Sequence, residues 1–155
     1  QVVFANTGWG GRSINELKGG HYLDYLIYTY NQLFNYFNKV DGILYHQGES
    51  DNNPDKVDLY YANFYEFVKI LNDNGIKAPI YLSQASYCAP ASPVNKSLTN
   101  IQRKLITDHD HIFEGPNTDL LTDTKFRFDQ CHFSEIGNDK FADMWVESLI
   151  KNFHK

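Results

Sequence analysis

The chain has 155 residues, a net charge of −5 and no basic run, which argues against nucleic acid as a partner. No apolar stretch reaches transmembrane length, so we predict no membrane partner. The length predicts one domain over residues 1–155, and a hydrophobic content of 42% is enough to build a core.

Short apolar runs alternate with amphipathic stretches in the first half of the chain. A β-branched and aromatic run at 2–6 predicts a strand, and because the chain starts inside this run, we expect a removed preceding segment or an incomplete domain. Apolar residues recur at three- and four-residue steps over 23–37, which is typical of a helix. Residues 43–45 predict a second strand, and a second helix should run from 54 to the glycine stop signal at 74–75.

The second half continues this alternation. Residues 79–83 and 111–113 predict two more strands, Ser92 should start the helix between them, and Ser134 should cap the last helix. The pattern predicts an α/β protein with helices on both faces of a mainly parallel sheet. Ligands bind beyond the carboxyl ends of the strands in such sheets. The polar segments 8–13, 46–51, 84–87 and 115–119 each follow a strand, so we expect them to share one rim.

An Asp-x-x-His turn, Asp129 to His132, precedes the last helix. Such a turn supplies a histidine base and the carboxylate that fixes its tautomer, so we expect His132 to act as base and Asp129 to orient it. The alternative is an aspartate in a turn and a histidine near a helix N-terminus.

A second polar segment, Tyr45–Asp51, reads Tyr-His-Gln-Gly-Glu-Ser-Asp and follows a buried strand. Polar groups in such a place need partners. We expect the Gln47 amide to donate to an oxyanion and Glu49 to brace neighbouring backbone, including the loop after the first strand. His46 is a rival base that we interpret as structural or substrate-lining. The alternative is a turn before the helix.

The glycine-rich segment 8–16 is the third candidate. A backbone N–H at Gly11 is a natural second oxyanion donor, because glycine lets a ligand approach closely. Ser13 with Glu16 fits a capping box, which we prefer to a nucleophilic serine. Arg12 either meets a substrate carboxylate or is a solvated surface charge. No convincing serine nucleophile is present in the chain.

Two cysteines, Cys88 and Cys131, are too few for a disulfide scaffold. Both fall in loops at the same end of the predicted sheet, so a bridge is geometrically feasible, but we favour two free thiols. No Cys/His pair has zinc-ligand spacing, and His109-x-His111 lacks a third ligand nearby, so we predict no metal site.

The three segments in this order resemble the SGNH/GDSL hydrolase superfamily, in its branch of carbohydrate acetylesterases that includes sialate O-acetylesterases and acetylxylan esterases. The matching residues are Gly10–Ile14, Tyr45–Asp51 and Asp129–Phe133, with Tyr45 in place of the usual tryptophan. The resemblance implies a flavodoxin-like three-layer α/β/α fold, ester hydrolysis without a cofactor, an O-acetylated carbohydrate as substrate, and an exported protein.

The family's serine lies on an earlier strand-to-helix turn that has no match here. The resemblance therefore implies that this chain is the larger C-terminal part of the domain, without its first strand and nucleophile. We expect an acetylesterase whose serine comes from outside the chain. The alternative is a non-catalytic glycan-binding or interaction module. An exposed sheet edge would favour pairing with another copy or with a separate N-terminal segment.

Overall fold

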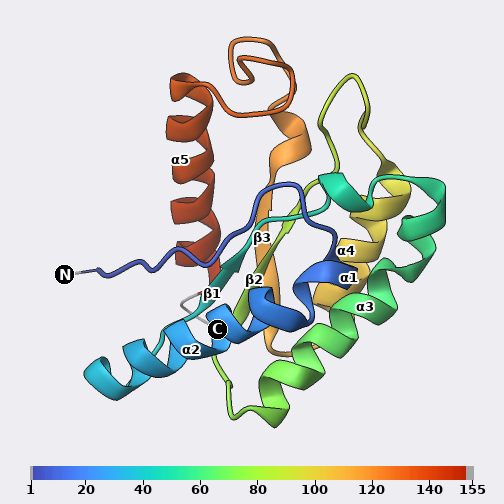
Figure 1. Cartoon of the computed structure of the whole chain (residues 1–155). Helices are drawn as coiled ribbons and strands as arrows, with labels where there is room; N and C mark the ends of the chain where they lie inside the picture. Colours follow the sequence, from blue (N-terminus) through green and yellow to red (C-terminus); the bar gives the residue numbers. More distant parts are fainter. Residues whose placement is uncertain (1, 153–155) are drawn as a thin grey trace.

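The computed structural model describes residues 2–152, in which a parallel sheet of three strands carries helices on both faces (Figure 1). The strands are β1 (Ile43–Tyr45), β2 (Ile80–Gln84) and β3 (Ile112–Asn117), in the spatial order β1-β2-β3. Every residue of β2 is buried because this strand lies between the other two. The predicted parallel sheet is confirmed.

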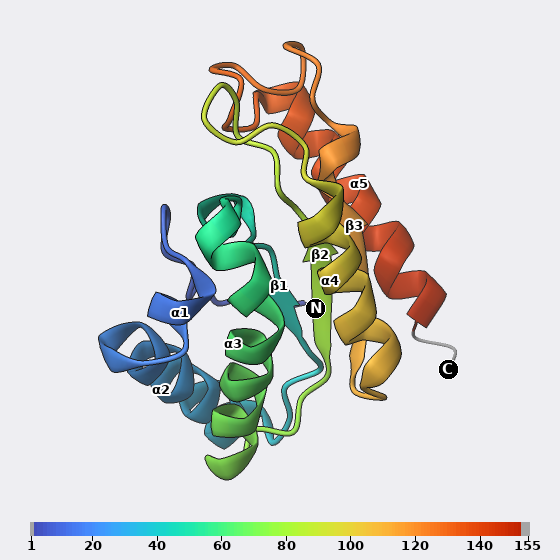
Figure 2. The same cartoon turned by 90° about the vertical axis from the view of Figure 1, so that its right-hand side faces the viewer.

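The helices form the two outer layers (Figures 1 and 2). On one face α3 (Pro54–Asp73) packs against α4 (Lys96–Asp108), and α4 contacts β2 and β3. On the other face α5 (Glu135–Asn152) contacts β3. The α1 helix (Ile14–Leu17) contacts both α3 and α2 (Gly20–Phe37). The predicted three-layer α/β fold is therefore confirmed.

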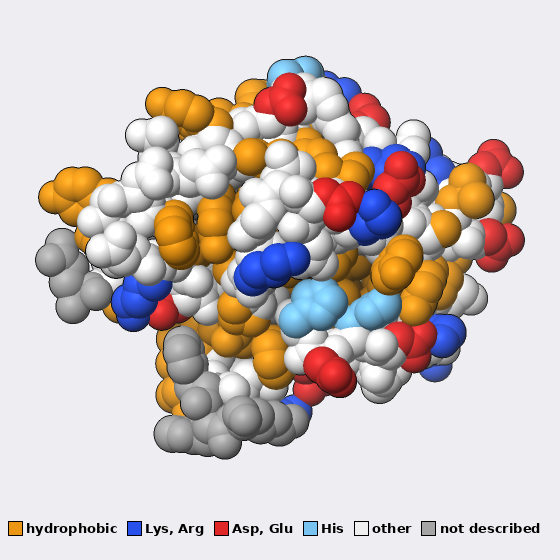
Figure 3. Space-filling view, turned by 90° about the horizontal axis from the view of Figure 1, so that it is seen from below, with side chains coloured by type: hydrophobic (Ala, Val, Ile, Leu, Met, Phe, Trp, Pro, Cys, Tyr) orange, Lys and Arg blue, Asp and Glu red, His pale blue; other side chains and the backbone are white. Residues whose placement is uncertain are grey.

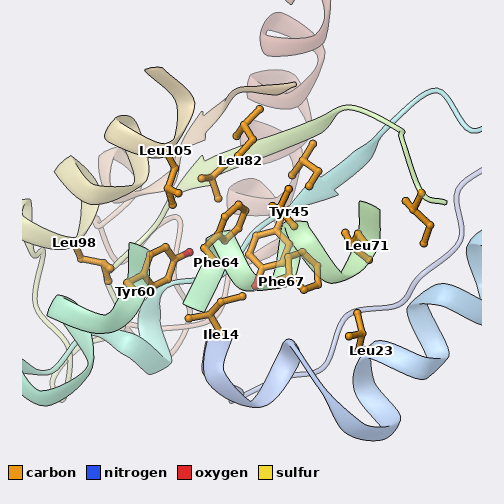
Figure 4. Close-up of a cluster of buried hydrophobic side chains, with 14 of the residues drawn as sticks. Ile14, Leu23, Tyr45, Tyr60, Phe64, Phe67, Leu71, Leu82, Leu98 and Leu105 are labelled. Atoms are coloured by element: carbon orange, nitrogen blue, oxygen red, sulfur yellow. The ribbon is translucent and has the colours of Figure 1, made fainter. Parts of the chain in front are cut away.

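The core lies between α3, α4 and the sheet (Figure 4). Its centre is aromatic: the ring of Tyr45 at the end of β1 meets the ring of Phe64 on α3 edge to face, with centroids 5.1 Å apart. Burying one such side chain contributes about 1.5–3 kcal/mol to stability. The core thereby fixes the end of β1, from which the polar segment 46–51 continues.

Two sequence predictions differ from the structure: a predicted strand is absent from the described residues, and one helix begins later than predicted. The predicted strand at 2–6 is wrong: this segment pairs with no strand in the described chain, and Val2 and Phe4 are 75% and 76% exposed. The third helix begins at Lys96 rather than at Ser92. Asn95 caps it by accepting from the Ser97 N–H, while Ser92 is bridged to Cys88 by backbone hydrogen bonds.

None of the helices within residues 2–152 combines the length and the apolar character needed to cross a membrane.

Candidate active site

The loop that follows β3 carries the Asp129–His132 pair. Two short 3-10 helices, η1 (Glu49–Asp51) and η2 (Thr118–Leu120), lie at the carboxyl ends of the strands. We call residues 121–134, between η2 and α5, the dyad loop. Asp129 Oδ2 lies 2.7 Å from His132 Nδ1, and Asp129 Oδ1 accepts from the backbone N–H groups of Cys131 and His132. The hydrogen bond from His132, followed by the two backbone N–H groups, lowers the pKa of Asp129 to about 2.

The imidazole of His132 is 73% exposed. Because Nδ1 donates to the Asp129 carboxylate, the neutral ring carries its lone pair on Nε2, where it can accept a proton. No hydrogen bond within residues 2–152 occupies Nε2. The pair therefore has the geometry of a general base and its orienting carboxylate.

His46, the rival base, lies at the end of β1 in a very different setting. Its Nε2 is 3.1 Å from the Thr118 hydroxyl, which itself donates to the Gln84 carbonyl. The Thr118 oxygen therefore accepts from His46, and Nε2 carries the proton. The His46 ring packs against Phe141 at 4.9 Å, and burial lowers its pKa. These contacts hold His46 neutral and in place.

Gln47 joins the segment Tyr45–Asp51 to the glycine-rich segment 8–16. Its amide nitrogen donates to the Arg12 carbonyl at 3.1 Å and to Asp51 Oδ2 at 2.5 Å, so both amide hydrogens are in use. Gly48 allows the segment to approach the end of β2, because a Cβ there would lie 1.8 Å from the Ala85 carbonyl oxygen.

Asp51 is a site residue that the sequence interpretation missed. Its Oδ2 accepts from the Ile14 N–H at 2.8 Å as well as from Gln47, and the residue is 1% exposed. Burial raises the pKa of Asp51. The bracing contact predicted for Glu49 is thus made by Asp51, because η1 turns Asp51 inward. Glu49 lies 3.7 Å from His46 Nε2 instead.

The glycine-rich segment turns at Gly11, whose φ of +71° favours glycine, and no residue in the described chain accepts its N–H. The predicted capping box is present: Glu16 accepts from both the N–H and the hydroxyl of Ser13. Arg12 donates to Glu16 at 3.0 Å and lies over the Tyr22 ring. Hydrogen bonds from the N–H and the hydroxyl of Ser13, followed by the one from Arg12, lower the pKa of Glu16 to about 2.

The structure brings the segments together in a chain of contacts. The Arg12 carbonyl accepts from the Gln47 amide. The ring centroids of His46 and of Phe133, which belongs to the dyad loop, are 6.1 Å apart. No hydrogen bond within residues 2–152 joins His132 directly to Gln47 or Gly11.

The cysteines are bonded to each other, so the interpretation as free thiols is wrong. The Cys88–Cys131 disulfide ties the loop after β2 to the dyad loop, and the Ala89 N–H donates to the Gln130 carbonyl beside it. The sequence placed both cysteines at one end of the sheet but gave no distance between them.

Histidines also gather at the opposite end of the sheet, seen from below in Figure 3, where the imidazoles of His109 and His111 lie 6.0 Å apart. No group of three or more His, Cys, Asp or Glu side chains suited to a metal ion lies within residues 2–152.

A family model described as carbohydrate esterase, sialic acid-specific acetylesterase, matches residues 2–151. No curated protein and no solved structure matches the chain significantly. The family match spans nearly the whole chain and agrees with the resemblance drawn from the three polar segments. The chain therefore belongs to the carbohydrate esterase family of sialic acid-specific acetylesterases.

Proposed function

We propose that this chain is the larger part of a serine-type carbohydrate O-acetylesterase. The observation that carries the proposal is the 2.7 Å contact between Asp129 Oδ2 and His132 Nδ1, with the imidazole exposed, in a chain of an esterase family. His132 serves as the base, Asp129 orients it, and Gly11 and Gln47 supply the oxyanion donors.

The nucleophilic serine comes from a segment outside this sequence. Ser13 and Ser86, which follow predicted strands, are buried, and their hydroxyls donate to Glu16 and Asp119 respectively. No serine in the described chain hydrogen-bonds to His132. A hydroxyl supplied from outside would approach the free Nε2 of His132.

In the reaction, the serine oxygen attacks the acetyl carbonyl and its proton passes to His132 Nε2. Asp129 stabilises the resulting imidazolium. The tetrahedral oxyanion accepts from the Gly11 N–H and from Gln47, which gives up one of its two present hydrogen bonds to do so. The sugar oxygen leaves with the proton from His132, and water then cleaves the acetyl-serine by the same route.

The test is hydrolysis of a chromogenic acetyl ester by the full-length protein. His132→Ala should lower kcat by about 10⁴-fold, because removal of one triad member disables the unit. His111→Ala, an exposed histidine at the opposite end of the sheet, is the matched control and should retain activity. Unchanged hydrolysis by His132→Ala would remove the role proposed for this residue.

A second candidate is a glycan-binding module without hydrolysis, which an exposed aromatic cluster favours. The Trp9 ring lies 5.2 Å from Tyr22 and 6.1 Å from Tyr25, and Trp9 and Tyr25 are 43% and 45% exposed. Aromatic rings that combine apolar faces with polar tips suit sugar surfaces. Trp9 directly precedes the Gly10-Gly11 turn, and the two tyrosines lie on α2.

The same experiment separates the two candidates when a binding arm is added. The chain has two tryptophans, so quenching of tryptophan fluorescence by O-acetylated sialic acid can be compared in Trp9→Phe and Trp145→Phe. Saturable quenching that only Trp9→Phe loses, with no hydrolysis by the full-length protein, would favour the binding module. Hydrolysis that depends on His132 would favour the enzyme.

A further inference from the structure

Arg127 is a buried cation within the dyad loop, two residues before Asp129. The residue is 3% exposed, and its guanidinium donates to three backbone carbonyls. Nε donates to Leu121 at 2.9 Å, Nη2 to Thr118 at 3.2 Å, and Nη1 to Cys131. Thr118 is the first residue of η2, and Leu121 directly follows its last residue. The third carbonyl, that of Cys131, lies inside the Asp129–His132 turn.

The same guanidinium lies against two aromatic rings. Its central carbon lies 4.0 Å from the ring centroid of Phe133, the residue after His132, and 5.6 Å from that of Tyr87. A planar guanidinium can stack on a ring and donate in several directions at once, whereas a lysine ammonium is a point charge. Arg127 thus contacts the residue on each side of His132.

No carboxylate within residues 2–152 forms an ion pair with this buried charge. Burial lowers the pKa of Arg127, and Glu49, Asp119 and Asp129 act on it only at longer range in the opposite direction. The charge is therefore held by carbonyl dipoles and rings. Such contacts are directional, and they are lost if the dyad loop moves.

Thr118 completes the connection to the sheet. Its carbonyl accepts from Arg127, while its hydroxyl contacts His46 at the end of β1 and Gln84 at the end of β2. We propose that Arg127 is a positioning residue, which transmits the fixed position of the strand ends to the Asp129–His132 turn and so sets where His132 lies. This inference rests on the proposed function.

The first arm of the test needs no enzymatic activity. The Asp129 carboxyl carbon is followed by NMR during acid titration of the 155-residue chain. Wild type and the matched control Arg103→Met, an exposed arginine on α4, should titrate at a pKa of about 2. Arg127→Met should raise this pKa toward the ordinary 3.8, because the turn that aligns the donors to Asp129 loosens. Arg127→Lys should do so to a smaller extent.

The second arm measures hydrolysis by the full-length protein. Arg127→Met should lower kcat by about 100-fold with KM unchanged, because a displaced base slows the chemical step without weakening substrate binding. A folded Arg127→Met variant that keeps the Asp129 pKa at about 2 overturns the proposal. If Arg127→Met does not fold, Phe133→Leu removes the stacking ring instead, and an unchanged Asp129 pKa there overturns it equally. An inactive wild type would refute the proposed function alone, since the NMR arm would still decide the role of Arg127.

Discussion

Two histidines near the carboxyl ends of the strands differ in exposure and in the ring nitrogen that is left free to accept a proton. His132 is exposed and donates through Nδ1, which leaves Nε2 free to accept a proton. His46 is packed against Phe141 and donates through Nε2 to Thr118. The preference for His132 as base follows from the atom that each ring leaves available.

The burial of His46 predicts a pH dependence of stability. Burial lowers its pKa below the ordinary 6.5, so the unfolded chain takes up a proton first as the pH falls. The contribution of neutral His46 to the free energy of unfolding is full above pH 6.5 and declines below it. Urea unfolding between pH 8 and pH 5.5 measures this decline.

His46→Gln should flatten the decline, whereas exposed His21→Gln should leave it unchanged. Equal stability of the wild type across this pH range would contradict the prediction.

Site residues were predictable where the contact is local in sequence. Asp129 and His132 share one turn, and Ser13 and Glu16 share one turn of helix, so spacing alone indicated each pair. Arg127 gave no signal, because its partners are backbone carbonyls and rings that only the folded loop assembles.

At the scale of elements, hydrophobic periodicity predicted the sheet and the helices. The two wrong predictions, the strand at 2–6 and the helix start at Ser92, depended on pairing partners that periodicity does not reveal. Residues 2–6 have strand-like composition, but a strand requires a neighbour, and the described chain offers this segment none. Ser92 fits a helix start, yet its backbone is bonded to Cys88 in the loop that the disulfide closes. Periodicity carries no information about such contacts.

The disulfide predicts a large dependence of stability on redox conditions. Cys88 and Cys131 are separated by 43 residues. Closing a loop of this size stabilises the folded state by about 4 kcal/mol in the chain-entropy model. A thiol reductant should therefore lower the free energy of unfolding, as measured in urea.

The double variant Cys88→Ser/Cys131→Ser should match the reduced wild type and should not respond to the reductant. A reductant that cleaves the bond but leaves wild-type stability unchanged would argue against this account.

At the scale of the whole molecule, the open edge of the sheet is the conspicuous feature. Parallel sheets are normally covered on both faces, and an uncovered edge strand presents a row of unpaired N–H and C=O groups. β1 pairs only with β2 in the described chain, and Leu44 is 36% exposed. Several large apolar side chains of the first 37 residues are also exposed: Val2, Phe4, Tyr28, Phe34, Tyr36 and Phe37.

We propose that this edge pairs with a second copy or with a separate N-terminal segment, and that the 155-residue chain alone self-associates. Sedimentation velocity should show an average mass that rises with concentration. Leu44→Lys should weaken the association, because an edge lysine opposes strand pairing. Leu59→Lys, on the exposed side of α3, is the matched control. A sharp monomer boundary at all concentrations would refute the proposal.

The sulfur bridge has a practical consequence for any attempt to assay this protein. It forms in oxidising compartments and is seldom retained in a bacterial cytosol. Recombinant material purified from such a host would lack the covalent link between the loop after β2 and the dyad loop. A failed assay on that preparation would not distinguish a reduced disulfide from a protein without esterase activity. The thiol content must therefore be measured before any negative result is accepted.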